Sequence, residues 1–78
     1  MDESGPSRVD EIIVRDPEIL SGEPVFRGTR VAVATVFEHL EAGLPLEEIL
    51  ESWPTLDRGD VIAVLRAAHR RVVLDQAA

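Results

Sequence analysis

Two stretches of the chain repeat the same apolar spacing, which predicts two short amphipathic helices. The first places its apolar residues at i, i+3, i+4 and i+7: Val33, Val36, Phe37 and Leu40. The second repeats that spacing with Leu46, Ile49, Leu50 and Trp53. Residues so spaced share one face of an α-helix, so each helix is expected to bury one face. Gly43 is suited to close the first helix in a left-handed conformation, and Pro54 stops the second.

A third and longer helix is predicted after Asp57, which is placed to cap it, with Asp60 in the position of the second half of a capping box. Its apolar face comprises Val61, Val64, Leu65, Ala68 and Val72. The opposite face comprises Gly59, Ala63, Arg66 and Arg70. A separate apolar edge lies between the two faces and is formed by Ile62 and Val73.

The residues before the helices are typical of short strands. Ile12–Val14 is a β-branched run, Val25–Arg27 is a second extended piece, and a third runs from Arg30 into the first helix. Residues 1–10 are polar and predict a flexible N-terminus. We therefore expect a mostly α fold, a three-helix bundle with a short N-terminal β element, as one domain over residues 11–75. A core this small favours additional burial against a partner.

Charge and composition narrow the classes of function. The net charge is −7, from fifteen carboxylates and eight arginines with no lysine, which opposes non-specific nucleic-acid binding. Residues 57–78 sum to +1 and are the one region suited to a polyanion. The absence of cysteine excludes disulfides and thiolate metal sites. No apolar run approaches the ~20 residues of a membrane span, and residues 1–11 lack the features of a secretion signal, so a cytoplasmic protein is expected.

No feature of the sequence indicates an enzyme active site. His39 and His69 have no carboxylate one helical turn away that could orient them or share a metal. No nucleophile elbow, phosphate-binding loop or metal-ligand spacing is present. We expect neither catalysis nor a cofactor.

The second and third predicted helices form a candidate DNA-binding unit. Residues 46–61 are typical of a helix, a tight turn and a second helix, and Arg58, Arg66 and Arg70 project from the second helix toward phosphates or base edges. The acidic residues of the preceding helix, Glu47, Glu48 and Glu51, oppose this interpretation. The alternative is a plain three-helix packing unit with solvated arginines.

The segment Gly22–Val31 is either a structural turn or a partner-binding edge. As a turn, it would let Arg27 and Arg30 pair with Glu23 or Asp16. As an edge, it would add a strand from another chain. The candidate residues of a dimer interface are Ile12, Val14 and Val25 from the β element, and Ile62 and Val73 from the third helix.

The run from Ile13 to Val31 resembles the opening signature of the bacterial domain-of-unknown-function 433 family. The similarity continues to Val61 and covers about residues 12–70, and its most specific part is the G-x-P-V-x-R-G-T-R-V string from Gly22 to Val31. The chain departs from the usual pattern at Pro45, where relatives tend to have Ser or Thr, and at Asp57. The resemblance implies a homeodomain-like trihelical fold and an antitoxin role opposite a PIN-like ribonuclease toxin.

On that basis we expect an antitoxin that silences its ribonuclease and, as a homodimer, represses its own operon. Arginines would pair with the carboxylates of the nuclease active site. The candidates are Arg27 and Arg30 on the turn and Arg70 and Arg71 near the end of the third helix, and the second pair is favoured. The alternatives are a stand-alone DNA-binding regulator and a dimeric interaction module that does not bind DNA.

Overall fold

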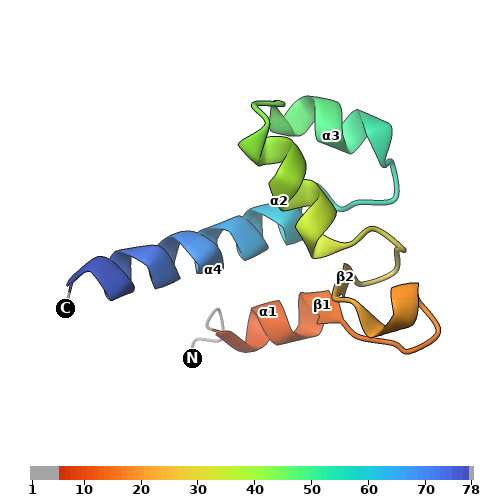
Figure 1. Ribbon diagram of the computed structural model, residues 1–78, viewed down its shortest axis with the longest axis horizontal. Coiled ribbons are helices and arrows are strands. Elements are labelled where there is room, and N and C mark those ends of the chain that lie inside the picture. Colours follow the sequence, from red (N-terminus) through yellow and green to blue (C-terminus); the bar gives the residue numbers. More distant parts are fainter. Residues whose placement is uncertain (1–5, 78) are drawn as a thin grey trace.

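The computed structural model describes residues 6–77, and within that range the chain is mostly helical. In chain order the elements are α1 (Pro6–Ile12), β1 (Ile13–Val14), the 3-10 helix η1 (Leu20–Gly22), β2 (Val25–Phe26), α2 (Val33–Glu41), α3 (Leu46–Ser52) and α4 (Arg58–Ala77). Helices α2 and α3 lie on one side of α4, and α1 and the β element lie on the other (Figure 1). The predicted mostly α architecture is confirmed, with one helix more than the three expected.

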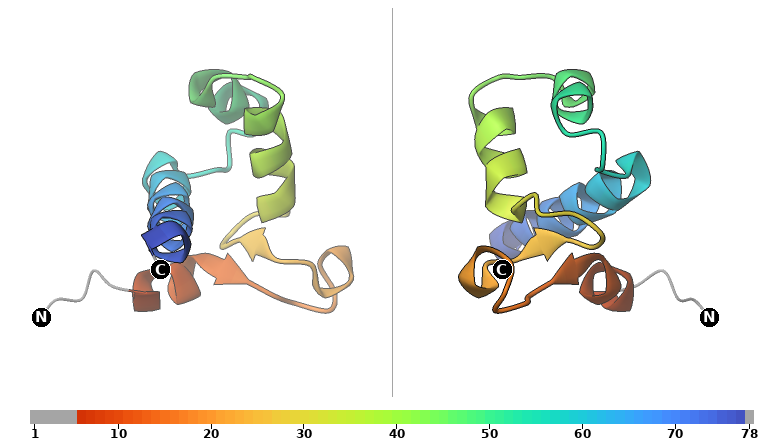
Figure 2. Two further views of the ribbon diagram at one scale, coloured as in Figure 1. Left: turned by 60° about the vertical axis from the view of Figure 1, so that its left-hand side comes forward. Right: turned by 90° about the vertical axis from the view of Figure 1, so that its right-hand side faces the viewer.

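Helix α1 overlaps the stretch, residues 1–10, for which a flexible N-terminus was predicted. Residues 1–5 lie outside the described part of the chain, but Pro6–Ile12 are helical. Val9 is half-buried and Ile12, one turn later, is buried. The helix lies beside α4 in Figure 1 and in the left view of Figure 2. A seven-residue helix is too short to be stable by itself, so packing against α4 accounts for it, and a single apolar turn carries too little periodicity to predict it.

The two short strands form an antiparallel pair close to where they were expected. Ile13 lies opposite Phe26 and Val14 opposite Val25. The third predicted strand is reduced to one bridge between Val25 and Ala32, because α2 begins at the next residue. Strand β2 is therefore paired on both sides, and it fixes the start of α2 relative to α1.

Helices α2 and α3 begin and end as their apolar spacing predicts. Gly43 has a φ of 96° directly after α2, a conformation that favours glycine. Pro45 precedes α3 with no side-chain capping bond. Asp57 caps α4, since its Oδ2 accepts a hydrogen bond of 3.0 Å from the backbone N–H of Asp60.

The core is a single cluster to which most elements contribute. Its buried members are Ile12, Phe26, Val31, Val36, Ile49, Leu56, Val61 and Val64. The predicted apolar faces of α2 and α3 pack against it through Val36 and Ile49 and their half-buried neighbours. The cluster lies between the α2–α3 pair and α1. The first half of α4 contributes Val61 and Val64 to it.

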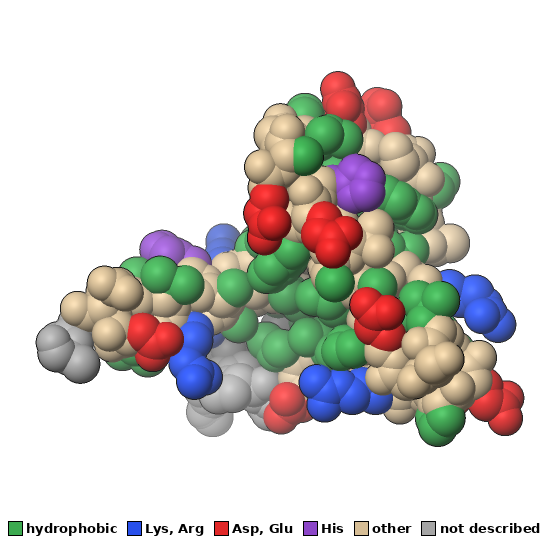
Figure 3. Space-filling model, in the orientation of Figure 1, with side chains coloured by type: hydrophobic (Ala, Val, Ile, Leu, Met, Phe, Trp, Pro, Cys, Tyr) green, Lys and Arg blue, Asp and Glu red, His purple; other side chains and the backbone are tan. Residues whose placement is uncertain are grey.

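Helix α4 differs from its predicted amphipathic pattern at both ends. Near its start, Ala63 also packs against the core, although it was placed on the face opposite the apolar one, because α4 lies between two layers and buries more than one face. Near its end, Val72 is 59% exposed, so the predicted apolar face stops contributing after Ala68. The last two turns extend beyond the other helices and strands (Figures 1 and 3). Within residues 6–77, no helix combines the length and apolar character needed to cross a membrane.

Candidate functional site

Arg27 forms an ion pair with a residue of its own chain, Asp60, and is therefore a poor candidate for binding a partner. Its Nε donates to Asp60 Oδ2 at 3.1 Å and its Nη2 donates to Asp60 Oδ1 at 3.0 Å. These hydrogen bonds, with the negative charge of Asp60, raise the pKa of Arg27 above its ordinary value. The pair joins β2 to the start of α4 and corrects two predictions: Arg27 does not pair with Glu23 or Asp16, and Asp60 binds Arg27 where a capping-box contact was expected.

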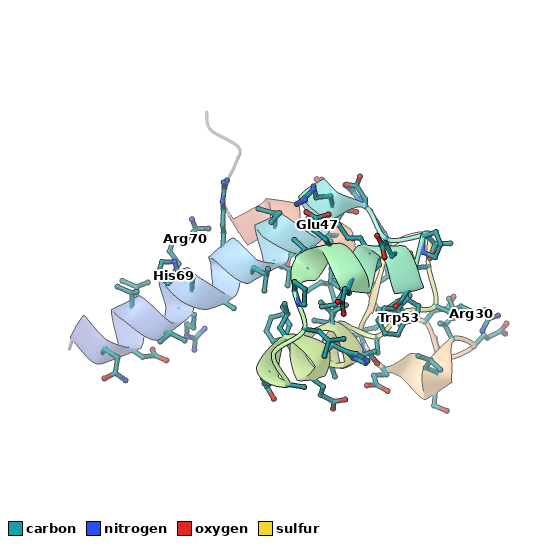
Figure 4. The ribbon with its side chains drawn as sticks, turned by 90° about the horizontal axis from the view of Figure 1, so that it is seen from above. Arg30, Glu47, Trp53, His69 and Arg70 are labelled. Atoms are coloured by element: carbon teal, nitrogen blue, oxygen red, sulfur yellow. The ribbon has the colours of Figure 1, made fainter. Side chains whose placement is uncertain are left out.

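The rest of the G-T-R-V turn explains the specific string in the sequence. Gly28 has a φ of 73°, which favours glycine. The Thr29 hydroxyl donates to the Phe26 carbonyl at 2.8 Å and accepts from the Val31 backbone N–H at 2.9 Å. The string is therefore mainly a structural turn. Arg30 is exposed and points away from the body of the molecule (Figure 4), so it is the arginine of this turn that remains available to a partner.

The outward face of α4 carries the arginines predicted to contact DNA. Arg66 and Arg70 are exposed, and Arg70 lies on the same side of α4 as His69 in Figure 4. Ile62 and Val73 share this face at helical spacing. Arg58, by contrast, forms an ion pair with Glu47 at the start of α3. Arg66 and Arg70 are thus exposed one helical turn apart, whereas Glu47 offsets the charge of Arg58.

The electrostatic balance of the α3–α4 pair is unfavourable for a polyanion. Over residues 46–77 six carboxylates oppose four arginines, which gives a net charge of −2. One carboxylate of α3, Glu47, pairs directly with Arg58 at the start of α4. A phosphate backbone would therefore meet few uncompensated positive charges.

The last turns of α4 combine exposed apolar side chains with arginines, and we call residues 70–75 the α4 tip. Val72, Val73 and Leu74 are 59%, 51% and 66% exposed. Arg70 and Arg71 precede them. Arg71 Nε lies 3.6 Å from Asp75 Oδ1, and because this ion pair is exposed, it restrains the Arg71 side chain only weakly. Exposed apolar side chains that lie next to one another, with the arginines that interfaces favour beside them, make this segment a candidate protein-binding surface.

A groove of about 720 Å³ lies at the other end of the molecule, beside the β element. Its apolar lining includes Val14, Val25, Leu20 and Trp53, and Arg30 adds a charge. Leu20 stays 47% exposed in a left-handed backbone conformation. His39 supports Trp53 through an edge contact with 4.9 Å between ring centroids, and its Nδ1 donates to the Thr35 carbonyl at 2.8 Å.

The residues predicted for a dimer interface divide into buried and accessible ones. Ile12 and Val25 are each 1% exposed within their own chain, so their side chains offer almost no surface to a second subunit. Both were expected on an accessible strand edge, but Ile12 ends α1 and packs into the core cluster, and Val25 lies in a strand that is paired on both sides. Val14 and Val73 are accessible, and Ile62 is half-buried.

Two residues of these surfaces were missed in the sequence. Leu74 lies in α4 after Val72, the last residue of the predicted apolar face. Only the full length of the helix would have indicated that Leu74 belongs to it. Leu20 lies between the two predicted strands, and the apolar pair Ile19–Leu20 was the available signal. Within residues 6–77, no three His, Asp or Glu side chains gather in a way that could hold a metal ion.

Comparison with known proteins relates most of the chain to one family. Residues 13–67 match the family described as "Protein of unknown function (DUF433)". The "Uncharacterized protein y4eO" of Sinorhizobium fredii is 51% identical over 47 residues, which cover 60% of this chain and 21% of that protein. The chain thus spans about a fifth of the length of this relative. The crystal structure of a DUF433 member from Anabaena variabilis superposes with a TM-score of 0.65 at 23% identity, over 94% of this chain and 83% of that one, and so shares the fold.

Proposed function

The chain belongs to the DUF433 family of proteins of unknown function, and from that premise we propose that it is an antitoxin-type domain that binds and inhibits a ribonuclease. The observation that carries the proposal is the α4 tip, where arginines and apolar side chains extend together beyond the core. The domain acts by binding and performs no chemistry itself.

The inhibitory chemistry is the pairing of guanidinium groups with carboxylates. A PIN-like nuclease gathers carboxylates around a divalent metal ion, and an arginine inserted there binds a carboxylate through two parallel hydrogen bonds. Arg70 is exposed on the outward face of α4. Arg71 exchanges its weak contact with Asp75 for a nuclease carboxylate at little cost.

The apolar part of the α4 tip supplies affinity that the arginines alone lack. Exposed ion pairs contribute little, whereas the burial of a Val or Leu side chain stabilises a complex by up to about 1.5–3 kcal/mol. Val73 lies one turn from Arg70 and would be buried with it. Arg30, at the opposite end of the molecule, is a secondary candidate for the same chemistry.

A second candidate function is operator binding through α3 and α4 as a helix-turn-helix, in the homeodomain-like manner. It is favoured by Arg66 and Arg70, which are exposed and lie one turn apart on α4, and it would let a dimer repress its own operon. The net charge of −2 on the helix pair and the pairing of Arg58 with Glu47 weigh against it. With three arginines, log K would fall with log salt at a slope of only about −3, and Arg58→Ala or Arg66→Ala should remove binding. A dimeric interaction module that binds no DNA is the third candidate, favoured by the chain's charge of −7.

The test is whether the adjacent reading frame encodes a ribonuclease that this chain inhibits. The two proteins are co-expressed and purified, and ribonuclease activity is titrated with wild type, with the Arg70→Ala/Arg71→Ala double variant and with Arg66→Ala as a matched control on the same helix. We expect the double variant to bind at least about tenfold more weakly, because a carboxylate left unpaired in a closed site is costly. Equal inhibition by all three proteins would refute the role of the α4 tip.

A further inference from the structure

The groove beside the β element combines an apolar wall with one charged side chain. Its accessible apolar residues are Val14 and Leu20, which are 36% and 47% exposed, and the half-buried Trp53. Val25 also lines the groove, but it is 1% exposed and adds almost no surface. Among the described residues that line the groove, Arg30 is the only charged one. A volume of about 720 Å³ and a mostly apolar lining with few polar groups are typical of small-molecule sites.

The apolar wall is held in place by the fold itself. The Trp53 ring contacts the edge of His39 at 4.9 Å between centroids and 84° between planes, and His39 is in turn fixed by its hydrogen bond to the Thr35 carbonyl. Leu20 and Ser21 have φ values of 51° and 57°. Such backbone conformations persist only where the surrounding structure enforces them, and they gather at binding sites. The wall is therefore formed before a ligand arrives.

The charge at the groove is available to a ligand. Arg30 is exposed and forms no ion pair with any residue whose side chain the structure describes. Figure 4 shows it at the same end of the molecule as Trp53, with its side chain directed outward. The groove thus has apolar residues within and a guanidinium at its rim. The carboxylates of the preceding segment do not line it; they are Asp16, Glu18 and Glu23.

We propose that this groove is a binding site for a small amphipathic carboxylate. The hydrocarbon part lies against Val14, Leu20 and Trp53, and the carboxylate pairs with Arg30, whose guanidinium can donate two parallel hydrogen bonds to it. A small inorganic anion would leave the apolar wall in water, and a neutral hydrocarbon would leave the guanidinium unpaired. This inference does not rest on the proposed function, because the α4 tip lies at the other end of the molecule (Figure 1).

The net charge of the protein makes the preference for a head group diagnostic. At −7, the molecule as a whole attracts cations and repels anions. Association that depends only on apolar contact and on this overall charge would therefore favour an amphipathic cation. A preference for the anion has to come from a local positive charge, and Arg30 is the one at the groove.

The experiment titrates the protein with octanoate and with octylammonium, which share a chain length and differ in the sign of the head group. Trp53 is the only tryptophan and lines the groove, so its fluorescence reports binding there. At physiological ionic strength, where distant charges are screened, octanoate should bind wild type about fivefold more tightly than octylammonium, the size of a favourable exposed ion pair.

Four variants assign the two parts of the site, and circular dichroism verifies each fold. Arg30→Gln should remove the preference for octanoate, and Arg30→Glu should reverse it. Leu20→Asn, which tolerates the left-handed backbone, should weaken both probes by a similar factor because it removes apolar wall. Arg66→Gln alters an exposed arginine of α4 that does not line the groove, and it should bind both probes as wild type does.

Three results would overturn the proposal. The first is a Trp53 signal that does not saturate with octanoate. The second is a wild type that binds octylammonium as tightly as octanoate or more tightly. The third is a preference for octanoate that survives in Arg30→Gln or is lost in Arg66→Gln. None of these results bears on nuclease inhibition by the α4 tip, which is measured separately.

Discussion

Replacing one valine by alanine at two positions of α4 separates the part of the helix that holds the fold from the part that extends beyond it. Val61 is 0% exposed and belongs to the core cluster, whereas Val72 is 59% exposed. The two substitutions are chemically identical and lie in one helix. Any difference in their effect on the free energy of unfolding therefore reports their packing.

The expected magnitudes follow from burial. Val61→Ala removes two carbons from the core at about 0.8 kcal/mol each, and the cavity that remains brings the loss to about 2–3 kcal/mol. Val72→Ala loses less than half of the transfer contribution, about 0.6 kcal/mol, and alanine's higher helix propensity returns about 0.5 kcal/mol. For a domain whose total stability is on the order of 4–12 kcal/mol, the first change is large and the second is close to zero.

The assay is urea unfolding followed by far-ultraviolet circular dichroism, with the fluorescence of Trp53 as a second probe. Coincident transitions and an unchanged m-value would show that only stability changed. Val73→Ala, 51% exposed, is the control and should behave like Val72→Ala. If Val72→Ala cost as much as Val61→Ala, the last turns of α4 would be packed in solution and the interpretation of the α4 tip as a free surface would be refuted.

Three further changes test how the elements are held. Asp57→Ala removes the cap of α4 and should lower the free energy of unfolding by about 1 kcal/mol. Asp57→Asn is the control, because asparagine can also cap a helix. Equal losses of stability in the two variants would contradict the capping role. Gly43→Ala should cost about 1–2 kcal/mol through its left-handed backbone alone, because an added Cβ meets no atom within 4 Å, and an unchanged urea midpoint would contradict this. Arg27→Leu should lower the melting temperature more than Asp60→Leu, because the carboxylate is 9% exposed and loses its partner while the guanidinium is 48% exposed and regains water; the reverse order in thermal unfolding would count against a structural role for the pair.

Elements with a local pattern could be predicted from the sequence. The repeated spacing around Val36 and Ile49 predicted α2 and α3, and Gly43 and Asp57 lie at the helix ends where their conformational and capping preferences place them. The short strands were also located to within a residue. For the helix ends the deciding interaction lies within a few residues along the chain, and for the strands it joins segments 11 to 13 residues apart.

Features that depend on distant contacts could not be predicted. Arg27 and Asp60 are 33 residues apart, so nearby carboxylates were assigned to Arg27 and its role was interpreted as partner binding. The burial of Ile12 depends on the position of α1 beside α4. The exposure of Leu20 depends on a left-handed backbone that leucine seldom adopts, so no residue preference indicates it.

Hydrogen exchange of the backbone amides, with and without the nuclease, tests the central proposal most directly. In the free protein at concentrations where it is monomeric, amides of residues 70–77 should exchange quickly, because the apolar side chains of this segment are exposed, while amides around Val61 exchange slowly. Addition of the nuclease should slow exchange in residues 70–77 and leave α3 unchanged. Protection confined to α3 and the first turn of α4, with residues 70–77 unaffected, would contradict the assignment of the α4 tip as the inhibitory surface.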